Sequence, residues 1–154
     1  NDDTFRQKVT HAFVERGIAP ERIELRGPSF HADVLKEYAD LDIALDPFPF
    51  TGGLTSCEAL WMGVPVVTWP QSRVVSRQTH AILNQIGLPQ LSAPDADEYV
   101  QIAVELANDR ERLAHLRATL RDRMRASPLL DVTGFTRQFE DTLIDLHRRV
   151  EAGK

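Results

Sequence analysis

The feature that most constrains the fold is a pair of short apolar runs with one compact helical pattern between them. The runs are "DIALD" at 42–46 and "VPVVTW" at 64–69, and the helical pattern carries Leu60 and Trp61 on its apolar face before it ends at Gly63. Near-continuous apolar strands that alternate with helices are typical of parallel sheets, because helices then cover both faces of the sheet. The sequence therefore predicts an α/β fold with a doubly wound parallel sheet.

The alternation of strands and helices extends over most of the chain. A hydrophobic period of about 3.6 residues predicts a helix, and a glycine just after the last apolar residue marks the expected helix end. A hydrophobic period of about two residues predicts a strand. Helices are predicted at 3–17, 31–41, 76–87 and 95–109, a short strand at 21–27, and a short strand or extended link at 88–93. We expect Thr55 or Ser56 to cap the helix between the two apolar runs.

The C-terminal part has a different pattern, which is helical, charged and without predicted strands. We expect residues 1–109 to form one lobe and residues 110–154 to form a helical arm of the same lobe. The six arginines between 110 and 125 alternate with acidic residues, which favours solvated ion pairs over a phosphate-binding patch. The last helix carries an apolar face that must lie on something, made by Phe135, Phe139, Leu143 and Leu146.

Composition narrows the functional classes. A chain of 154 residues with 42% hydrophobic content is long enough for one core, and a net charge of −5 argues against a nucleic-acid partner. The lone Cys57 suits a reducing, cytoplasmic location and a buried role. No apolar run approaches the roughly 18 residues that a membrane span needs, so no membrane partner is expected. The chain begins in a helical pattern without an initiator Met, and we expect a piece of a longer protein.

The turn that leads into the central helix, "TGGLTSCE" at 51–58, is the predicted ligand site. Ligands of doubly wound sheets bind outside the carboxyl ends of the strands, and a helix start offers unpaired amides and partial positive charge to an anion such as a diphosphate. Gly52 and Gly53 allow close approach of the backbone and any left-handed torsions it requires. Thr55 and Ser56 add hydroxyl donors, and Glu58 lies one helical turn further on, within reach of a ribose hydroxyl.

The same residues are equally compatible with a structural turn. In that interpretation the glycines form a tight turn, Thr55 is only an N-cap and Glu58 is half of a capping box. Neither a dinucleotide fingerprint nor a phosphate-loop lysine is present, and the histidines show no paired metal-ligand spacing, so no metal is expected. A receiver-like signalling domain is a further alternative, and it would place magnesium at Asp42 and Asp46.

From residue 42 to residue 93 the chain resembles a known enzyme family. The segment "DIALDPFPFTGGLTSCEALWMGVPVVTWPQSRVVSRQTHAILNQIGLPQLSA" is similar to the C-terminal catalytic lobe of the O-GlcNAc transferase family, particularly bacterial tetratricopeptide-linked or SPINDLY-like members. The resemblance extends from "ERIELRG" to the closing "FEDTLIDLH", which is nearly the whole chain. It implies a GT-B glycosyltransferase of two Rossmann-like lobes. It further implies inverting transfer of N-acetylglucosamine from UDP-GlcNAc to Ser or Thr of a protein acceptor, without a metal or other cofactor.

The resemblance also implies roles for the residues of the turn. The diphosphate-binding segment of the family corresponds to Gly53, Leu54 and Thr55, with Ser56 beside them, and the ribose-binding acidic residue corresponds to Glu58. Many relatives carry His or Thr where this chain has Leu54, so the chain departs from the family pattern at one phosphate contact.

The uracil-binding segment of the family corresponds to "PSFHADVLKEY". Phe30, His31 and Val34 are therefore the base-side candidates, although a lone histidine such as His31 is also compatible with a surface or capping role. Val34 stands where many relatives carry His, so the chain also departs from the family pattern at a base-stacking position. For Ser76 and Arg77 the family pattern favours a structural role at the cleft between lobes.

The expected partners follow from the family. They are a UDP-sugar, a protein acceptor, and the N-terminal lobe and helical repeats of the parent chain. A lysine that meets the diphosphate lies upstream of the matching region in the family, so we expect the catalytic residues mainly outside this chain and little activity from the fragment alone. A non-catalytic interaction or regulatory module on the same fold is the alternative that the departures at Val34 and Leu54 leave open.

Overall fold

In the computed structural model, which describes residues 3–153, the chain forms two compact units. The first unit ends at Val34 and the second begins at Leu35. The division lies inside helix α2 (His31–Glu37), and the predicted boundary after residue 109 stays a prediction.

The first unit consists of α1 (Asp3–Val14), a 3-10 turn η1 (Pro20–Arg22) and an extended segment that leads to α2. Helix α1 is where the periodicity predicts it, and Gly17 follows it with φ of +80°. The strand predicted at 21–27 is wrong. In the described chain the segment has no strand partner, and a strand needs one to pair its backbone groups.

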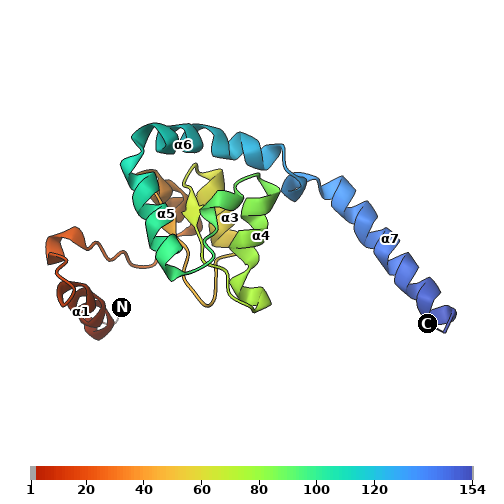
Figure 1. Ribbon diagram of the computed structural model, residues 1–154, viewed down its shortest axis with the longest axis horizontal. Helices are drawn as coiled ribbons and strands as arrows, with labels where there is room; N and C mark the ends of the chain where they lie inside the picture. Colours follow the sequence, from red (N-terminus) through yellow and green to blue (C-terminus); the bar gives the residue numbers. More distant parts are fainter. Residues whose placement is uncertain (1–2, 154) are drawn as a thin grey trace. The chain divides into compact units, whose positions relative to one another are not determined.

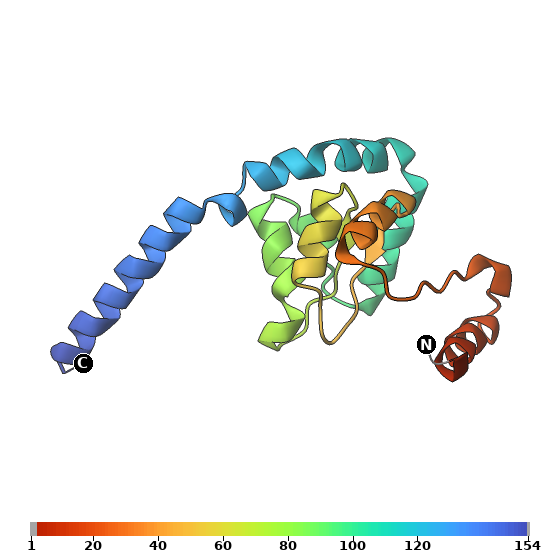
Figure 2. The same cartoon turned by 180° about the vertical axis from the view of Figure 1, so that it is seen from behind.

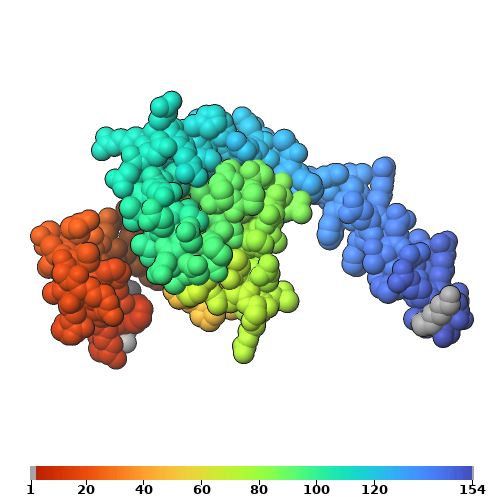
Figure 3. Space-filling model, viewed as in Figure 1, coloured from red at the N-terminus to blue at the C-terminus, as the bar shows by residue number. Residues whose placement is uncertain are grey.

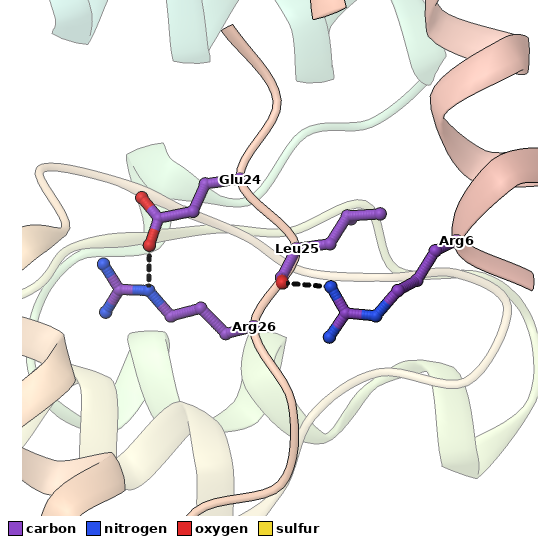
Figure 4. Close-up of polar contacts among 4 residues, drawn as sticks. All are labelled: Arg6, Glu24, Leu25 and Arg26. Carbon is purple, nitrogen blue, oxygen red and sulfur yellow. Dashed lines mark hydrogen bonds and ion pairs between the residues drawn. The ribbon is translucent and has the colours of Figure 1, made fainter. Parts of the chain in front are cut away.

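Side-chain hydrogen bonds, and not strand pairing, hold part of this segment. Arg6 of α1 donates through Nη1 to the carbonyl oxygen of Leu25 at 2.7 Å, and Arg26 donates through Nε to Glu24 at 2.7 Å (Figure 4). The alternation of Ile23 and Leu25 with charged residues therefore marks an extended link tied to α1, and not a sheet strand.

The second unit contains a small sheet surrounded by helices (Figures 1 and 2). Its elements in chain order are η2 (Tyr38–Asp40), β1 (Ala44–Leu45), α3 (Leu54–Trp61), β2 (Val66–Val67), η3 (Val74–Ser76), α4 (Gln78–Gln85), η4 (Pro89–Leu91), α5 (Ala96–Asn108), α6 (Arg110–Arg125), η5 (Pro128–Leu130) and α7 (Val132–Glu151). The predicted helices at 76–87 and 95–109 are thus confirmed, with η3 forming the start of the first.

The sheet is parallel, as predicted, but shorter than the sequence suggests. β1 pairs with β2 in the register Ala44↔Val66 and Leu45↔Val67, with α3 as the crossover between them. A parallel bridge pairs Thr68, directly after β2, with Ser92, directly after η4. The segment 88–93 therefore has a single paired position. The broad doubly wound sheet is therefore reduced, within residues 3–153, to two strands and one bridge.

The core lies between the sheet and the helices. Val66 and Val67 of β2 are buried together with Leu60 of α3, Leu83 of α4 and Leu106 of α5. In the space-filling view α4 and α5 cover the sheet on the side shown in Figure 1, and α6 runs along the top of the unit (Figure 3). Burial of these apolar side chains, each worth about 1.5–3 kcal/mol, holds the carboxyl ends of the strands in place.

The arginines of α6 include an expected solvated ion pair, Arg125 with Asp122 at 3.5 Å, but others contact neighbouring elements. Arg121 donates through Nε to the carbonyl oxygen of Trp61 at 2.8 Å, and the guanidinium groups of Arg121 and Arg125 each lie 5.4 Å from the Trp61 ring centroid. Arg117 donates to the carbonyl oxygen of Leu41. The contacts of Arg121 and Arg125 tie α6 to the end of α3, and Arg117 ties it to the segment before β1, because a guanidinium can both donate to a carbonyl and stack on an aromatic ring.

Helix α7 carries the apolar face expected from the sequence, and that face is exposed. Phe135 and Phe139 stack with ring centroids 6.2 Å apart, and no residue of α7 is buried. Within the described residues, the main packing partner of α7 is η5, which directly precedes it. None of the helices within residues 3–153 has the length and apolar content to span a bilayer.

Gly63 offers a test of the junction between α3 and α6. Its φ is +86°, and a Cβ there would lie 2.9 Å from the carbonyl oxygen of Arg117. Gly87 is the matched control, since its φ is +71° but the nearest atom to its Cβ is 4.0 Å away. We expect Gly87→Ala to lower the free energy of unfolding by about 1–2 kcal/mol and Gly63→Ala to lower it by roughly 1–3 kcal/mol more. Chemical denaturation of the two variants measures the difference, and equal losses would contradict the contact with Arg117.

Candidate functional site

The candidate site begins where the loop between β1 and α3 leaves the carboxyl end of β1. Asp46 follows β1 directly, and its amide donates to the carbonyl oxygen of Val67 at 2.9 Å, which continues the pairing with β2. Phe48 packs edge-on against Trp69, with ring centroids 4.7 Å apart, and anchors the middle of the loop. Thr51 closes the loop through its amide and its hydroxyl, which both donate to the carbonyl oxygen of Val75.

Gly52 is held at both ends of its backbone. Its amide donates to Oδ1 of Asp46 at 2.7 Å, and its carbonyl oxygen accepts from the hydroxyl of Thr79 at 3.0 Å. A Cβ at Gly52 would lie 2.3 Å from Oγ of Ser56, whereas a Cβ at Gly53 would meet only the side-chain oxygen of Gln78, at 2.8 Å. Neither glycine has positive φ. Gly52 is thus required for close packing, and the left-handed torsions considered from the sequence are not used.

The amides at the start of α3 are open. Gly53 is the N-cap residue and makes no side-chain cap, so the prediction that Thr55 or Ser56 caps this helix is wrong. In the described part of the chain, no carbonyl or side chain accepts from the amides of Gly53, Leu54, Thr55 or Ser56. These are the first-turn donors that an α-helix cannot satisfy internally, and they carry its partial positive charge.

The start of α3 contrasts with the starts of the three helices that follow α4. Asp95, Asp109 and Asp131 each accept a hydrogen bond from an amide in the first turn of α5, α6 and α7. Such a carboxylate satisfies the open donors and places negative charge beside them. Gly53 leaves the same donors of α3 available to an anion from outside the helix.

A small pocket adjoins this helix start. It has a volume of about 130 Å³ and is lined by side chains of η2, β1, the loop and α3, among them Tyr38, Asp46, Thr55 and Ser56. The Tyr38 hydroxyl donates to the carbonyl oxygen of Thr55 at 3.2 Å. Burial, and to a smaller extent the carboxylate of Glu58, raises the pKa of Tyr38, so its hydroxyl stays a donor to a higher pH than that of a free tyrosine.

The predicted contact residues of the second unit differ in their exposure and in whether their side chains already make hydrogen bonds. Leu54 is 74% exposed, and Thr55 is also exposed at the first turn. Ser56 is buried, with its Oγ 2.8 Å from Oγ1 of Thr79. Its hydroxyl is already engaged inside the protein, so the expected phosphate contact of Ser56 stays a prediction that rests on its amide. Glu58 lies one turn further on and is half-buried.

The predicted base contacts belong to the other unit. Phe30 is 86% exposed and lines a pocket of about 370 Å³ with Pro28, Ser29 and Asp33, and His31 begins α2. Because these residues and the helix start of α3 lie in different compact units, a joint nucleotide site stays a prediction. The structural role of Ser76 is plain, since its buried hydroxyl donates to the carbonyl of Arg73 and accepts from the amide of Gln71.

The sequence did not identify the residues that support the loop. Asp46 is 3% exposed, and its carboxylate accepts from Gly52 and, at 2.6 Å, from the hydroxyl of Thr68. Tyr99 of α5 donates to the carbonyl oxygen of Asp46 at 3.0 Å. The only sequence signal for this role of Asp46 was its position at the end of a predicted strand. Its partners Thr68 and Tyr99 lie far away in the sequence.

This arrangement does not fit the receiver-like alternative. Both carboxylate oxygens of Asp46 accept hydrogen bonds within the protein, and Asp42 is exposed with Arg117 at 3.9 Å. No group of three His, Cys, Asp or Glu side chains within residues 3–153 is placed to hold a metal ion. The magnesium site proposed for Asp42 and Asp46 therefore has no support from the described geometry.

The fold and the site together define an α/β protein in which a parallel strand leads into an open helix start, an arrangement suited to anionic ligands. The family model "Glycosyl transferase family 41" matches residues 4–139. The chain belongs to this glycosyltransferase family.

The relatives are longer enzymes. The chain is 38% identical over 148 residues to a probable UDP-N-acetylglucosamine–peptide N-acetylglucosaminyltransferase SPINDLY of Petunia hybrida, covering 96% of the chain and 16% of the relative. It is 34% identical over 140 residues to the UDP-N-acetylglucosamine–peptide N-acetylglucosaminyltransferase of Caenorhabditis elegans, covering 91% of the chain and 12% of the relative. The chain therefore spans about one sixth or less of the length of these relatives.

A solved structure supports the same relationship. The chain matches a mutant of the O-GlcNAc transferase of Thermobaculum terrenum with a TM-score of 0.86 and 40% identity. The match covers 92% of this chain and 27% of that one. The resemblance inferred from the sequence is thus confirmed at the level of the family.

The two glycines of the loop make a matched pair for testing the helix start. We expect Gly52→Ala to lower the free energy of unfolding by about 1–3 kcal/mol, because the new methyl group must displace Ser56 from Thr79. Gly53→Ala meets only the flexible end of Gln78 and should cost less than about 1 kcal/mol. Chemical denaturation of both variants measures this. A larger loss for Gly53→Ala would show that the loop packs differently.

Glu58 can be tested through its neighbour Cys57. Burial and the carboxylate of Glu58 raise the pKa of Cys57, so less thiolate is present at pH 8 than in a free cysteine. We expect Glu58→Gln to lower that pKa and to speed alkylation by iodoacetamide, with Glu105→Gln on α5 as the control. An unchanged rate in Glu58→Gln would mean that this carboxylate does not face Cys57.

Proposed function

We propose that this chain is the nucleotide-sugar-binding part of an inverting protein O-glycosyltransferase that transfers N-acetylglucosamine from UDP-GlcNAc to Ser or Thr of a protein acceptor. The names of the relatives in plants and in the worm support the donor and the kind of acceptor. The fold match to an O-GlcNAc transferase over 92% of the chain supports its assignment as the C-terminal, Rossmann-like lobe of a GT-B enzyme.

The observation that carries the proposal is the uncapped start of α3. The amides of Gly53, Leu54 and Thr55 form a cluster of donors at the carboxyl end of β1, without a competing carboxylate cap. A diphosphate that docks there is stabilised by hydrogen bonds from these amides and by the helix dipole. Glu58, one turn further along the same helix, is then the proposed partner of the ribose hydroxyls.

The same donors have a role in the proposed reaction. The bond between the sugar anomeric carbon and the diphosphate oxygen breaks while the acceptor hydroxyl oxygen bonds to that carbon from the opposite face. Negative charge therefore grows on the leaving diphosphate, and preorganised amides stabilise it. Loss of one such donor typically lowers the rate by about 10²-fold to 10³-fold. The base that takes the hydroxyl proton is proposed to lie in the remainder of the parent chain, with the acceptor groove.

We propose that the reaction needs no metal or other cofactor and takes place in the cytoplasm. The first point is supported by the amides of α3, which supply the positive potential that the leaving group requires. The proposed further partners are the N-terminal lobe and helical repeats of the parent protein, because the relatives extend far beyond the region that this chain matches.

Leu54 provides a sharp test. Its side chain is 74% exposed beside the open amides. Leu54→Asp adds a negative charge there, which favours the helix dipole by about 0.3–1 kcal/mol but repels a diphosphate. We expect the variant to keep or raise the melting temperature and to weaken UDP binding at least about 10-fold, a loss of roughly 1.4 kcal/mol, in titration calorimetry of the full-length gene product.

The matched control is Leu54→Asn, which has nearly the same shape and no charge. It should bind UDP much more tightly than Leu54→Asp. Saturable UDP binding that is equal in both variants would place the diphosphate elsewhere. No binding of UDP by the wild-type protein at millimolar concentration would favour the non-catalytic alternative.

A further inference from the structure

We infer that Asp46 and Thr79 are positioning residues of the nucleotide site, which turn the open amide of Gly53 toward the diphosphate. The inference rests on the function proposed above. Neither side chain needs to touch the ligand, because each acts through the backbone of Gly52. The direction of one peptide group decides where the amide of Gly53 points.

The carbonyl oxygen of Gly52 and the amide of Gly53 belong to the same peptide plane. In a trans peptide these two groups point in opposite directions. The carbonyl oxygen of Gly52 accepts from Thr79, whose side chain is fully buried in α4, so it points into the protein. The amide of Gly53 must therefore point away from α4, out of the packed interior.

The preceding peptide group is held from the other side. The amide of Gly52 donates to Oδ1 of Asp46 at 2.7 Å, a charge-assisted hydrogen bond in a buried setting. Asp46 in turn cannot rotate freely, because its Oδ2 accepts from Thr68 and its carbonyl accepts from Tyr99. Two successive peptide groups are thus fixed, and with them the direction of the first amide of α3.

Thr79 is itself oriented by a neighbour. Its single hydroxyl proton goes to the carbonyl of Gly52, so the contact of 2.8 Å with Ser56 must have Ser56 as the donor. The chain of donors therefore runs from Ser56 to Thr79 to Gly52. This gives the buried Ser56 hydroxyl a role in the site without contact to the ligand.

Burial of a carboxylate costs free energy, but the carboxylate of Asp46 can accept hydrogen bonds from two elements at the same time. A neutral carbonyl would satisfy the amide of Gly52 with a smaller desolvation cost. The two oxygens of Asp46 join Gly52 of the loop to Thr68 at the end of β2. The loop is consequently fixed to the same sheet edge from which α3 projects, and small displacements of such a site are known to cost about 10²-fold in function.

The test compares variants of the full-length gene product in UDP titration calorimetry and in thermal unfolding. Asp46→Ala and Thr79→Val each remove one restraint on Gly52, and we expect UDP affinity to fall by roughly 10-fold to 100-fold. Asp46→Asn is the rescue variant, because its side-chain oxygen can accept from Gly52 while its amide donates to the Thr68 hydroxyl. We expect its affinity to stay within about threefold of the wild type.

Asp109→Ala is the control for stability alone. Asp109 caps α6 through the amide of Arg112 and does not contact the loop. We expect it to lower the melting temperature and to leave UDP affinity unchanged. A positioning role thus separates affinity from stability across the variants, whereas a merely structural role makes the two fall together.

The possible failures are distinguishable. Wild-type protein that does not bind UDP overturns the proposed function and this inference with it. Wild-type binding that persists unchanged in both Asp46→Ala and Thr79→Val overturns the inference alone, as does an Asp46→Asn variant that loses as much affinity as Asp46→Ala. If Asp46→Ala does not fold, the comparison of Thr79→Val with Asp109→Ala decides the matter by the same criterion.

Discussion

The second unit depends on one buried carboxylate. Asp46 lies at the end of β1, and hydrogen bonds join it to the loop, to the end of β2 and to α5. A carboxylate removed from water is tolerated only when donors surround it, so the loop and the neighbouring elements must adopt the arrangement that supplies them. The open start of α3 is a consequence of that arrangement, since the bond to Asp46 fixes the residue before its N-cap.

Local patterns were sufficient to predict much of this fold. The apolar runs at 42–46 and 64–69 form a parallel pair, and glycines at 17, 63 and 87 follow helices with positive φ. These features depend on residues close together in the sequence, where periodicity and backbone preference act directly. The strand predicted at 21–27 fails for the opposite reason, because alternation alone does not provide a neighbouring strand.

The sequence motif predicts where the candidate site lies, but not the long-range hydrogen bonds that hold it. The turn at Gly52 and Gly53, the exposed Thr55 and the following Glu58 are visible as a motif. The restraints on that turn come from Thr68, 22 residues from Asp46, and from Thr79, 27 residues from Gly52. No spacing rule connects such residues. The N-cap was also misassigned, because hydroxyl residues usually take that position and only the packing shows that Ser56 turns inward.

The arginines of α6 have an electrostatic consequence for the opposite end of α3. Arg121 donates to the carbonyl oxygen of Trp61, in the last turn of α3, and Arg125 lies over the same indole. Cationic groups there offset the negative pole of the helix, while at the other end no side chain caps the first turn. An anion that reaches the start of α3 therefore finds open amide donors, although the chain as a whole carries a net charge of −5.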